Sequence, residues 1–381
     1  MQLIINAHII TETHTIPNGW LTVGDGKILY FGDGAPPPTP SSVIINAHGK
    51  ILTAGFLDIH VHGGNGHEIM DATPQAITEL SQFYARHGVT GFLATTWTAD
   101  DEPIYRALAQ VAQTTVDGAY LWGAHVEGPY VNPNKAGAQN PHLIRRANMT
   151  EFARWQATGV VRLMTIAPEF PENLAMIDHC TAHHIVTSAG HTDATLADMR
   201  RAIEHGLSNT THTFNAMRPL HHREAGTVGA ALLFPELRCE VICDGVHVQP
   251  DVVKLLYQAK GADGVILITD AVRGAGLPYG TEYSQDGRRV TVRESAYLDD
   301  GTLAGSTLTM DVAVQNFVRF TGKSLDEVWR CTSYNAARAL KIDDQTGSIA
   351  VGKRADLVLL DESLNVTMTM VGGKVVYILP S

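Results

Sequence analysis

The middle of the chain alternates short apolar runs with longer segments in which apolar residues recur every three or four positions. Such alternation is typical of strands that follow helices. Several of the helical segments end in glycine, as helix C-termini often do. Eight apolar runs have the length of buried strands: AGFLDIHVH, VTGFLATT, AYLWGAHVE, VVRLMTIAP, IVTSAGH, LSNTTHTF, CEVICDGVH and GVILITD. Eight strands with helical crossovers predict an α/β fold, a (β/α)8 barrel of the TIM type.

Two stretches depart from this regular alternation. Between LSNTTHTF and CEVICDGVH, the segment GTVGAALLF is short and glycine-rich, so its helix signal is weak. After the eighth run, residues 281–301 have the pattern of an inserted β-hairpin. Two helical segments, residues 307–322 and 324–340, then lead to the C-terminal part.

Both ends of the chain have a different pattern, with short apolar runs separated by turn signals. At the N-terminal end these signals include GDG repeats and a proline-rich turn at residues 35–40. We therefore expect residues 1–52 and 350–381 to form one small β-sandwich, and residues 53–349 to form the barrel. A length of 381 residues fits this division, since a barrel needs about 250 residues.

Composition excludes several classes of partner and compartment. The net charge of −11 argues against nucleic acid or an anionic membrane, while a small anionic substrate needs only a few local cations. No apolar run approaches the roughly 20 residues of a membrane span, and the first residues have the pattern of a strand rather than a signal peptide. The four scattered cysteines, of which Cys239 and Cys243 are expected in the core, indicate a reducing cytoplasm.

Acidic and imidazole side chains stand at the ends of six of the eight predicted strands. His60 and His62 end the first strand, and residues two apart on a strand face the same side, so both can face the barrel axis. The C-terminal ends of barrel strands meet at one mouth, where TIM-barrel active sites lie. The third strand and the fifth to eighth strands bring further residues there: Glu127, His191, His212, His247 and Asp270.

This set of side chains predicts a catalytic metal site. Imidazole and carboxylate ligands without thiolate suit Zn²⁺, Fe²⁺ or a similar divalent ion, and a catalytic ion lowers the pKa of its water toward neutrality. Asp270, on the last strand, is placed to accept a proton from that water and to pass it to a leaving group. A helix N-cap is the structural alternative for Asp270.

Ordered sequence blocks along nearly the whole chain carry a family resemblance. AGFLDIHVHGG and GKRADLVLLD are marks of the amidohydrolase superfamily. More specific blocks resemble its N-acetylglucosamine-6-phosphate deacetylases: HVEGPYVNPNKAGA, SAGHTDA, THTFNAMRPLHHREAGTVGA, ICDGVHV, LITDAV and LAGSTLTM. The resemblance implies metal-dependent hydrolysis of the N-acetyl group of an amino sugar 6-phosphate, which yields acetate and the free amine.

The resemblance also implies a role for individual residues. The ligands of the main ion correspond to Glu127, His191 and His212. Because the pair His60 and His62 is intact, binding of a second ion is left undecided. Asp270 matches the general acid/base. Positions that contact the substrate correspond to Ala138, Asn215, Ala216, His247, Leu303, Ala304 and Gly305. Arg223 matches an arginine that binds the sugar phosphate in the neighbouring subunit's site, which implies a homodimer.

One position departs from the family pattern and several alternatives stay open. Relatives usually have histidine where this chain has Gln139, which can hydrogen-bond a sugar but cannot become cationic. The choice between the gluco and galacto epimers is therefore left undecided, as is the native metal. The rival functions are an N-acyl amino-acid deacylase, a cyclic amidase and a non-catalytic scaffold. The scaffold predicts broken ligands, whereas the full ligand set is present.

Overall fold

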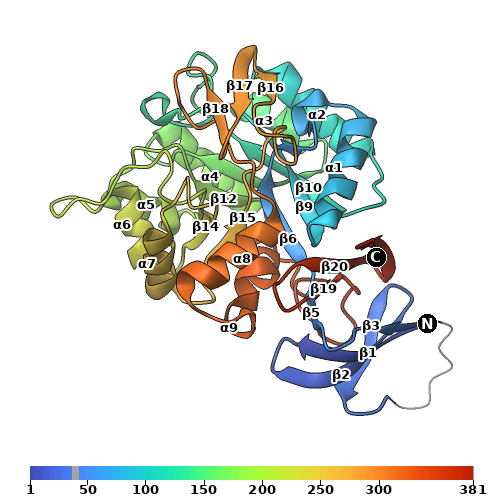
Figure 1. The fold of residues 1–381 in the computed structure, drawn as a ribbon. Coiled ribbons are helices and arrows are strands. Elements are labelled where there is room, and N and C mark those ends of the chain that lie inside the picture. The colour runs from blue at the N-terminus through green and yellow to red at the C-terminus, as the bar shows by residue number, and fades with distance from the viewer. Residues whose placement is uncertain (37–42, 381) are drawn as a thin grey trace.

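The computed structural model describes residues 1–36 and 43–380 and contains an eight-stranded parallel barrel (Figure 1). The predicted proline-rich turn lies outside the described residues from position 37 onward. All neighbouring strands pair in parallel, in chain order. The strands are β6 (Phe56–Val61), β9 (Val89–Thr96), β10 (Tyr120–Glu127), β11 (Val161–Ile166), β12 (Val186–Ala189), β13 (Asn209–Thr210), β14 (Arg238–Ile242) and β15 (Val265–Ile268).

Backbone hydrogen bonds at the C-terminal ends of β6 and β15 bring the first and last strands together. The amide of Asp270 donates to the carbonyl of His60 at 2.9 Å, and the amide of His62 donates to the carbonyl of Ala271 at 2.9 Å. These bonds form at the C-terminal ends of the strands, so they also fix the spacing between first-strand and eighth-strand side chains at the barrel mouth.

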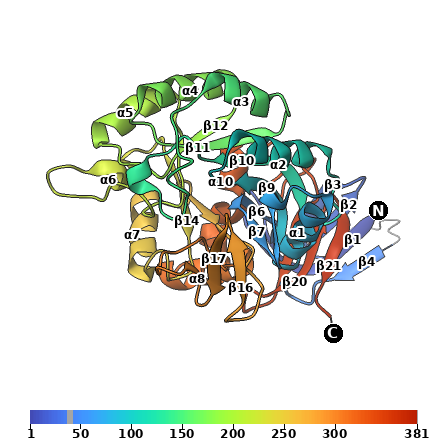
Figure 2. The same cartoon turned by 90° about the horizontal axis from the view of Figure 1, so that it is seen from above.

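Helices surround the barrel, as the view from above shows (Figure 2). Local sequence explains where several begin: Thr73 caps α1, which has proline in its first turn, and Thr195 and Asp198 form a capping box on α5. The helices around the barrel are α1 (Pro74–Arg86), α2 (Asp101–Gln113), α3 (Met149–Gln156), α4 (Pro171–Ala182), α5 (Leu196–Glu204), α6 (Gly226–Leu233), α7 (Pro250–Lys260) and α8 (Met310–Thr321).

Helix α6 forms in the segment whose helix signal was weak. Residues 226–231 are all buried, and their side chains are small. Tertiary burial stabilises such a helix although its glycines lower its intrinsic propensity. The local sequence pattern underestimated this segment because its stabilisation comes from burial against neighbouring elements, which include α5 and α7, rather than from the helix itself.

The insertion after β15 contains the predicted hairpin, formed by β16 (Glu282–Gln285) and β17 (Arg288–Val292), and a third strand, β18 (Ala296–Leu298). The last helical segment is divided by a π-helical turn at 330–334, which separates α9 (Leu325–Trp329) from α10 (Asn335–Ala339). The remaining short elements near the barrel are β7 (Gly63–Gly64), β8 (His67–Glu68) and the 3-10 turns Ile69–Asp71 and Pro133–Lys135.

Strands from both chain ends form one further hydrogen-bonded sheet, in the order β21-β20-β19-β5-β1-β2-β3 with β4 beside β1. The predicted sandwich is thus one continuous sheet, with a core of its own that includes Ile4, Leu21, Leu357 and Met370. Its strands are β1 (Gln2–Ile10), β2 (Thr15–Gly24), β3 (Lys27–Asp33), β4 (Val43–Asn46), β5 (Ile51–Ala54), β19 (Leu357–Leu360), β20 (Val366–Val371) and β21 (Lys374–Ile378). The exact division at residues 52 and 350 stays a prediction.

Among the described residues, no helix has both the length and the apolar character that a membrane crossing needs. The four cysteines are buried and free of disulfides. Cys239 and Cys243 belong to the barrel core, as predicted.

Candidate metal and acid–base site

A pocket opens at the C-terminal ends of the barrel strands, where the sequence placed the site. Its lining contains most of the predicted residues, including acidic, imidazole and small side chains from separate strands and loops. The predicted residues that line it are His62, Glu127, Ala138, Gln139, His191, His212, Asn215, Ala216, His247, Asp270, Leu303, Ala304 and Gly305. His60 is fully buried beside it, and Arg223 lies elsewhere.

Glu127, His191 and His212 converge on one point. Oε1 of Glu127 lies 3.1 Å from Nε2 of His191 and 3.1 Å from Nε2 of His212, and the two nitrogens are 3.0 Å apart. All three side chains are at least nine-tenths buried. Ligand atoms that each lie about 2 Å from one ion stand about 3 Å or a little more from one another, so this group has the spacing of a metal site.

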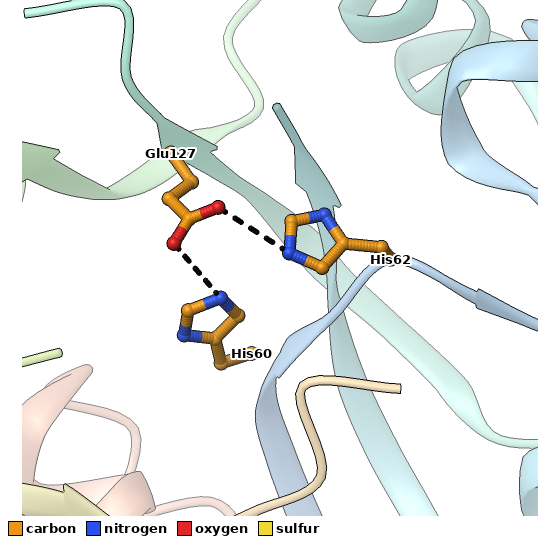
Figure 3. Close-up of side chains that lie close together, drawn as sticks. All are labelled: His60, His62 and Glu127. Atoms are coloured by element: carbon orange, nitrogen blue, oxygen red, sulfur yellow. Dashed lines mark ion pairs between the residues drawn. The ribbon is translucent and has the colours of Figure 1, made fainter. Parts of the chain in front are cut away.

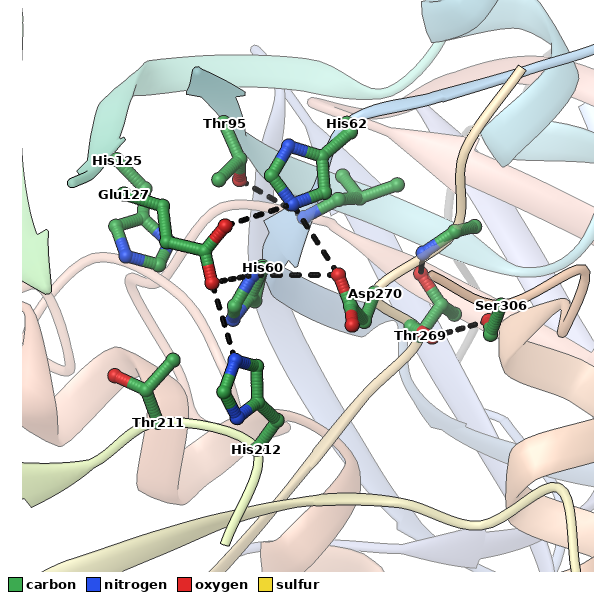
Figure 4. A network of polar contacts seen from close by, with 12 residues as sticks. His60, His62, Thr95, His125, Glu127, Thr211, His212, Thr269, Asp270 and Ser306 are labelled. Carbon is green, nitrogen blue, oxygen red and sulfur yellow. Dashed lines mark hydrogen bonds and ion pairs between the residues drawn. The ribbon is translucent and has the colours of Figure 1, made fainter. Parts of the chain in front are cut away.

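His60 and His62 form a second group with the same carboxylate (Figure 3). Nε2 of His60 is 3.5 Å from Oε1 of Glu127, and Nε2 of His62 is 3.4 Å from Oε2. Asp270 faces both imidazoles, with Oδ1 3.4 Å from His60 and 3.2 Å from His62 (Figure 4). Glu127 therefore lies between two groups of imidazoles, and Asp270 lies beside one of them.

The hydrogen bonds around these imidazoles fit metal ligands. Nδ1 of His191 is 3.0 Å from the Lys135 carbonyl, which can only accept, so this nitrogen carries a proton and Nε2 is the ring atom that faces Glu127 and His212. Nε2 of His60 is buried and has no hydrogen-bond partner among the described residues. A buried polar atom without a partner is costly, and a cation between the imidazoles and the carboxylates would remove that cost.

The carboxylates of the site are ionised because of the imidazoles around them. Burial disfavours the charge on Glu127, but His60 together with hydrogen bonds from His191 and His212 outweighs burial and holds the pKa of Glu127 well below its usual range. The pKa of Asp270 is lowered in the same way, against burial, by His60 and His62. Every ion-pair partner of these two carboxylates in the described residues is a histidine.

Three of the predicted metal-binding and acid–base residues have left-handed backbone angles. The φ angle is 47° at His191, 31° at His212 and 50° at Asp270. Side chains other than glycine rarely adopt this conformation, which costs on the order of 1–3 kcal/mol and is often found at functional sites. At each of these positions the chain turns out of a strand, and the side chain is directed into the pocket lining.

Polar contacts fix two of the predicted substrate residues. Gln139 accepts a hydrogen bond from the Thr98 amide at 2.8 Å and donates to Oε2 of Glu127 at 2.6 Å. Nδ1 of His247 is 2.6 Å from Oδ2 of Asp244, which leaves Nε2 as the ring atom available to a ligand. The fixed orientation of both side chains is what a specific binding site requires.

Arg223 is the one predicted site residue far from this pocket. It is exposed on the long loop between β13 and α6, which extends away from the barrel in Figure 1. Its Nη1 lies 2.7 Å from Nε2 of the adjacent His222. The structure therefore does not bring Arg223 to the site of its own chain.

Several residues of the site were missed by the sequence reasoning. Glu240 on β14 lies 3.1 Å from Nδ1 of His60, and Asp244 holds His247. A signal for Glu240 existed, because a carboxylate inside the apolar run CEVIC is unusual. The hairpin residues Gln285, Asp286 and Arg288 also line the pocket, but nothing in the local sequence indicates that the insertion covers the mouth.

Comparison with known proteins agrees with the geometry. The family model described as "Amidohydrolase family" matches residues 51–376 of the chain. The N-acetylglucosamine-6-phosphate deacetylase of Bacillus subtilis (strain 168) is 40% identical over 385 residues, which cover 99% of this chain and 97% of that protein. The N-acetylgalactosamine-6-phosphate deacetylase of Escherichia coli O157:H7 is 35% identical over 372 residues, 96% of this chain and 97% of that one.

Among solved structures, the Mycobacterium smegmatis N-acetyl-D-glucosamine-6-phosphate deacetylase in complex with N-acetyl-D-glucosamine-6-phosphate superposes with a TM-score of 0.92. It is 33% identical, and the match covers 98% of this chain and 99% of that one. Sequence similarity and fold thus agree over nearly the whole length. The chain belongs to the amidohydrolase family and, within it, to the N-acetylglucosamine-6-phosphate deacetylases.

Proposed function

We propose that the protein hydrolyses the acetamide of N-acetylglucosamine 6-phosphate, releasing acetate and glucosamine 6-phosphate. The observation that carries this proposal is the pocket, in which the carboxylate–imidazole cluster, Asp270 and the substrate-contacting positions of the family meet in one cavity. The relatives named for this reaction match the chain over nearly its whole length, and one of them has a solved structure in complex with this sugar phosphate.

Glu127, His191 and His212 would hold a divalent ion, zinc or iron(II), through one oxygen and two nitrogens. His60 and His62 would contribute to a second ion that shares Glu127. Such an ion supplies Lewis-acid chemistry, since it polarises a carbonyl and makes water acidic enough to yield hydroxide near neutral pH. Because Glu127 is held ionised by its neighbours, the ligand set needs no proton loss from this carboxylate before it binds a cation.

Asp270 acts as the general acid and base. Its ionised carboxylate accepts the proton of the attacking water, and the same carboxyl then donates that proton to the nitrogen of the departing amine. The water oxygen bonds to the acetyl carbon first, and the C–N bond then breaks as the carbonyl group of acetate re-forms. Only Oδ1 of Asp270 faces His60 and His62, at 3.4 and 3.2 Å, so its other oxygen is available for the proton transfer.

The sugar lies against residues that come from four separate loops. His247, oriented by Asp244, contacts the substrate through Nε2. The backbone around Ala138, Asn215, Ala216 and the loop Leu303–Gly305 forms the remaining walls. Gln139 replaces the histidine usual in the family and is already engaged with Glu127, so the gluco preference depends on the other walls.

Arg223 binds the 6-phosphate in the neighbouring subunit of a homodimer. Three facts support this proposal: the side chain is exposed, it lies outside its own pocket, and its loop extends away from the barrel. A guanidinium is well suited to a phosphate because it donates two parallel hydrogen bonds. The four free cysteines support a reducing compartment, and we place the reaction in the cytoplasm.

The galacto epimer is the second candidate substrate, because one relative of 35% identity is named for it. The test compares amide hydrolysis of five compounds by the metal-loaded protein. Acetate release is measured from the two epimeric N-acetylated sugar 6-phosphates, unphosphorylated N-acetylglucosamine and an N-acetyl amino acid, and ring opening is measured for a cyclic amide. We expect the highest kcat/KM with the gluco phosphate. Preference for the galacto phosphate would overturn the choice of epimer. Preference for the amino acid or the cyclic amide would overturn the proposed function.

A further inference from the structure

Glu240 is a buried carboxylate inside the barrel that the proposed reaction does not use. It lies on β14 and has no exposed surface. Its Oε2 is 3.1 Å from Nδ1 of His60 and 3.4 Å from the amide nitrogen of His212, while its Oε1 has no partner among the residues that the structure describes. The adjacent Cys239 faces the opposite side of the strand and contacts the carbonyl of Ala231 on α6.

A carboxylate this deeply buried needs a compensating group. The described ion pairs of Glu240 contain a single basic side chain, His60. When Nδ1 of His60 donates to Glu240, the proton of the neutral ring is used, and Nε2 keeps only a lone pair. Glu240 thereby decides which nitrogen of His60 is presented to the pocket.

The lone pair of His60 then faces two more carboxylates. Nε2 lies 3.5 Å from Oε1 of Glu127 and 3.4 Å from Oδ1 of Asp270, and the geometry makes a hydrogen bond with neither of them. A lone pair beside two ionised oxygens is repulsive unless a positive charge lies among them, which is a proton in the metal-free chain and a metal ion in the loaded one. His62 faces the same two carboxylates through its own Nε2, at 3.4 and 3.2 Å.

We propose that Glu240 is a positioning residue for a second metal ion: it holds His60 as the Nδ1-protonated tautomer, so that Nε2 joins His62 and Glu127 as a ligand. This inference rests on the proposed metal dependence. Carboxylates that hold metal-binding histidines in this way contribute about 10- to 100-fold to metal affinity. Among the described residues, His60 is the one side chain that the Glu240 carboxylate bonds, besides the backbone amide of His212, so its loss should act mainly on the second ion.

The experiment counts ions with Mn²⁺ as the probe, by elemental analysis after equilibrium dialysis and by EPR. We expect two Mn²⁺ per wild-type chain, with a spectrum that shows magnetic coupling through the shared Glu127. E240L should retain one ion with an uncoupled spectrum, because its second site weakens about 100-fold. E240Q keeps an oxygen that accepts from Nδ1, so its second site should weaken about 10-fold.

C239A is the matched control, because it alters the same strand on the face away from His60, and it should bind two coupled ions. One ion in the wild-type chain, or two coupled ions of unchanged affinity in E240L, would overturn the proposal. If E240L does not fold, E240Q decides, and wild-type affinity at its second site would refute the role of Glu240. Acetate release by the wild-type chain is measured separately, so that failure of the deacetylase proposal is distinguished from failure of this one.

Discussion

The side-chain amide of Gln139 donates a 2.6 Å hydrogen bond to Oε2 of Glu127, while the amide of Thr98 donates to the Gln139 oxygen at 2.8 Å. The Thr98 contact fixes which end of the amide is the donor, so Gln139 can only present N–H to the carboxylate. Gln139 thus orients the carboxylate that both candidate metal groups share. A position that the sequence assigned to sugar binding also supports the metal site.

Replacement of Gln139 should therefore affect the metal before it affects the sugar. In Gln139→Ala, the loss of the donor to Glu127 should weaken metal affinity about 10-fold, measured by competition with a chromogenic chelator. Asn140→Ala is the control, because Asn140 is adjacent and, among the described residues, its side-chain oxygen accepts from the His142 amide rather than contacting Glu127. Unchanged metal affinity in Gln139→Ala, with a raised KM, would return Gln139 to a purely substrate-binding role.

Replacement of Asp270 by asparagine should separate proton transfer from metal binding. The amide keeps the shape of the side chain but cannot accept and return a proton, so kcat should fall by about 10²- to 10⁴-fold. Glu127, His191 and His212 are unchanged, so elemental analysis should still find metal at their site. Turnover near the wild-type rate would remove Asp270 from the mechanism.

Arg223→Ala tests the phosphate site. Loss of a charge-assisted hydrogen bond costs about 1.5–3 kcal/mol, which corresponds to a KM for the sugar phosphate raised roughly 10- to 100-fold. KM for the unphosphorylated sugar should hardly change. Arg200→Ala removes an arginine that lies over the Phe234 ring instead and serves as the charge-matched control. Equal effects of Arg223→Ala on the two sugars would contradict the phosphate assignment.

The ion pair between His87 and Asp311 should make stability depend on pH. It joins the end of α1 to the start of α8, with Nδ1 of His87 3.0 Å from Oδ2 of Asp311. Burial disfavours the charge on Asp311, but His87 and nearby hydrogen bonds outweigh burial and lower the pKa of Asp311 below its ordinary value of 3.8. A lowered carboxyl pKa means that the pair stabilises the fold above pH 3.8 and that this stability is lost as the pH falls through the lowered value.

The variant Asp311→Asn isolates this contribution. At pH 7 its free energy of unfolding should be about 1 kcal/mol lower than that of the wild-type chain, because the hydrogen bond to His87 loses its charge. The difference should shrink toward zero as the pH falls through the lowered pKa of Asp311, where the wild-type aspartate becomes protonated as well. Chemical denaturation across this pH range measures it, and a difference independent of pH would exclude ionisation of Asp311 as its cause.

The sequence predicted the barrel because the spacing of apolar residues within each segment distinguishes a strand from a helix. It predicted the ligands for a related reason, since Glu127, His191 and Asp270 follow apolar runs whose ends a parallel barrel must bring together. Helix α6 was underestimated because its stability comes from burial of small residues against the rest of the barrel.

Contacts between separate loops and strands could not be predicted in this way. Alternate residues of β14 face the barrel interior, and Glu240 is one of them. The sequence of an isolated strand does not reveal which of its two faces is the interior. The contact of Gln139 with Glu127 depends on the path of an irregular loop, which has no period. The position of Arg223 outside its own pocket likewise required three-dimensional coordinates.

The most direct test of the central claim is acetate release from N-acetylglucosamine 6-phosphate by the metal-loaded protein, by the same protein after chelation, and after metal is restored. Glu127→Gln is assayed in parallel, since it removes the carboxylate that the two candidate metal groups share. We predict rapid release that chelation abolishes and added metal restores, and no restoration in Glu127→Gln. Release that persists in the chelated protein, or full activity of Glu127→Gln, would contradict a metal-dependent deacetylase built on this site.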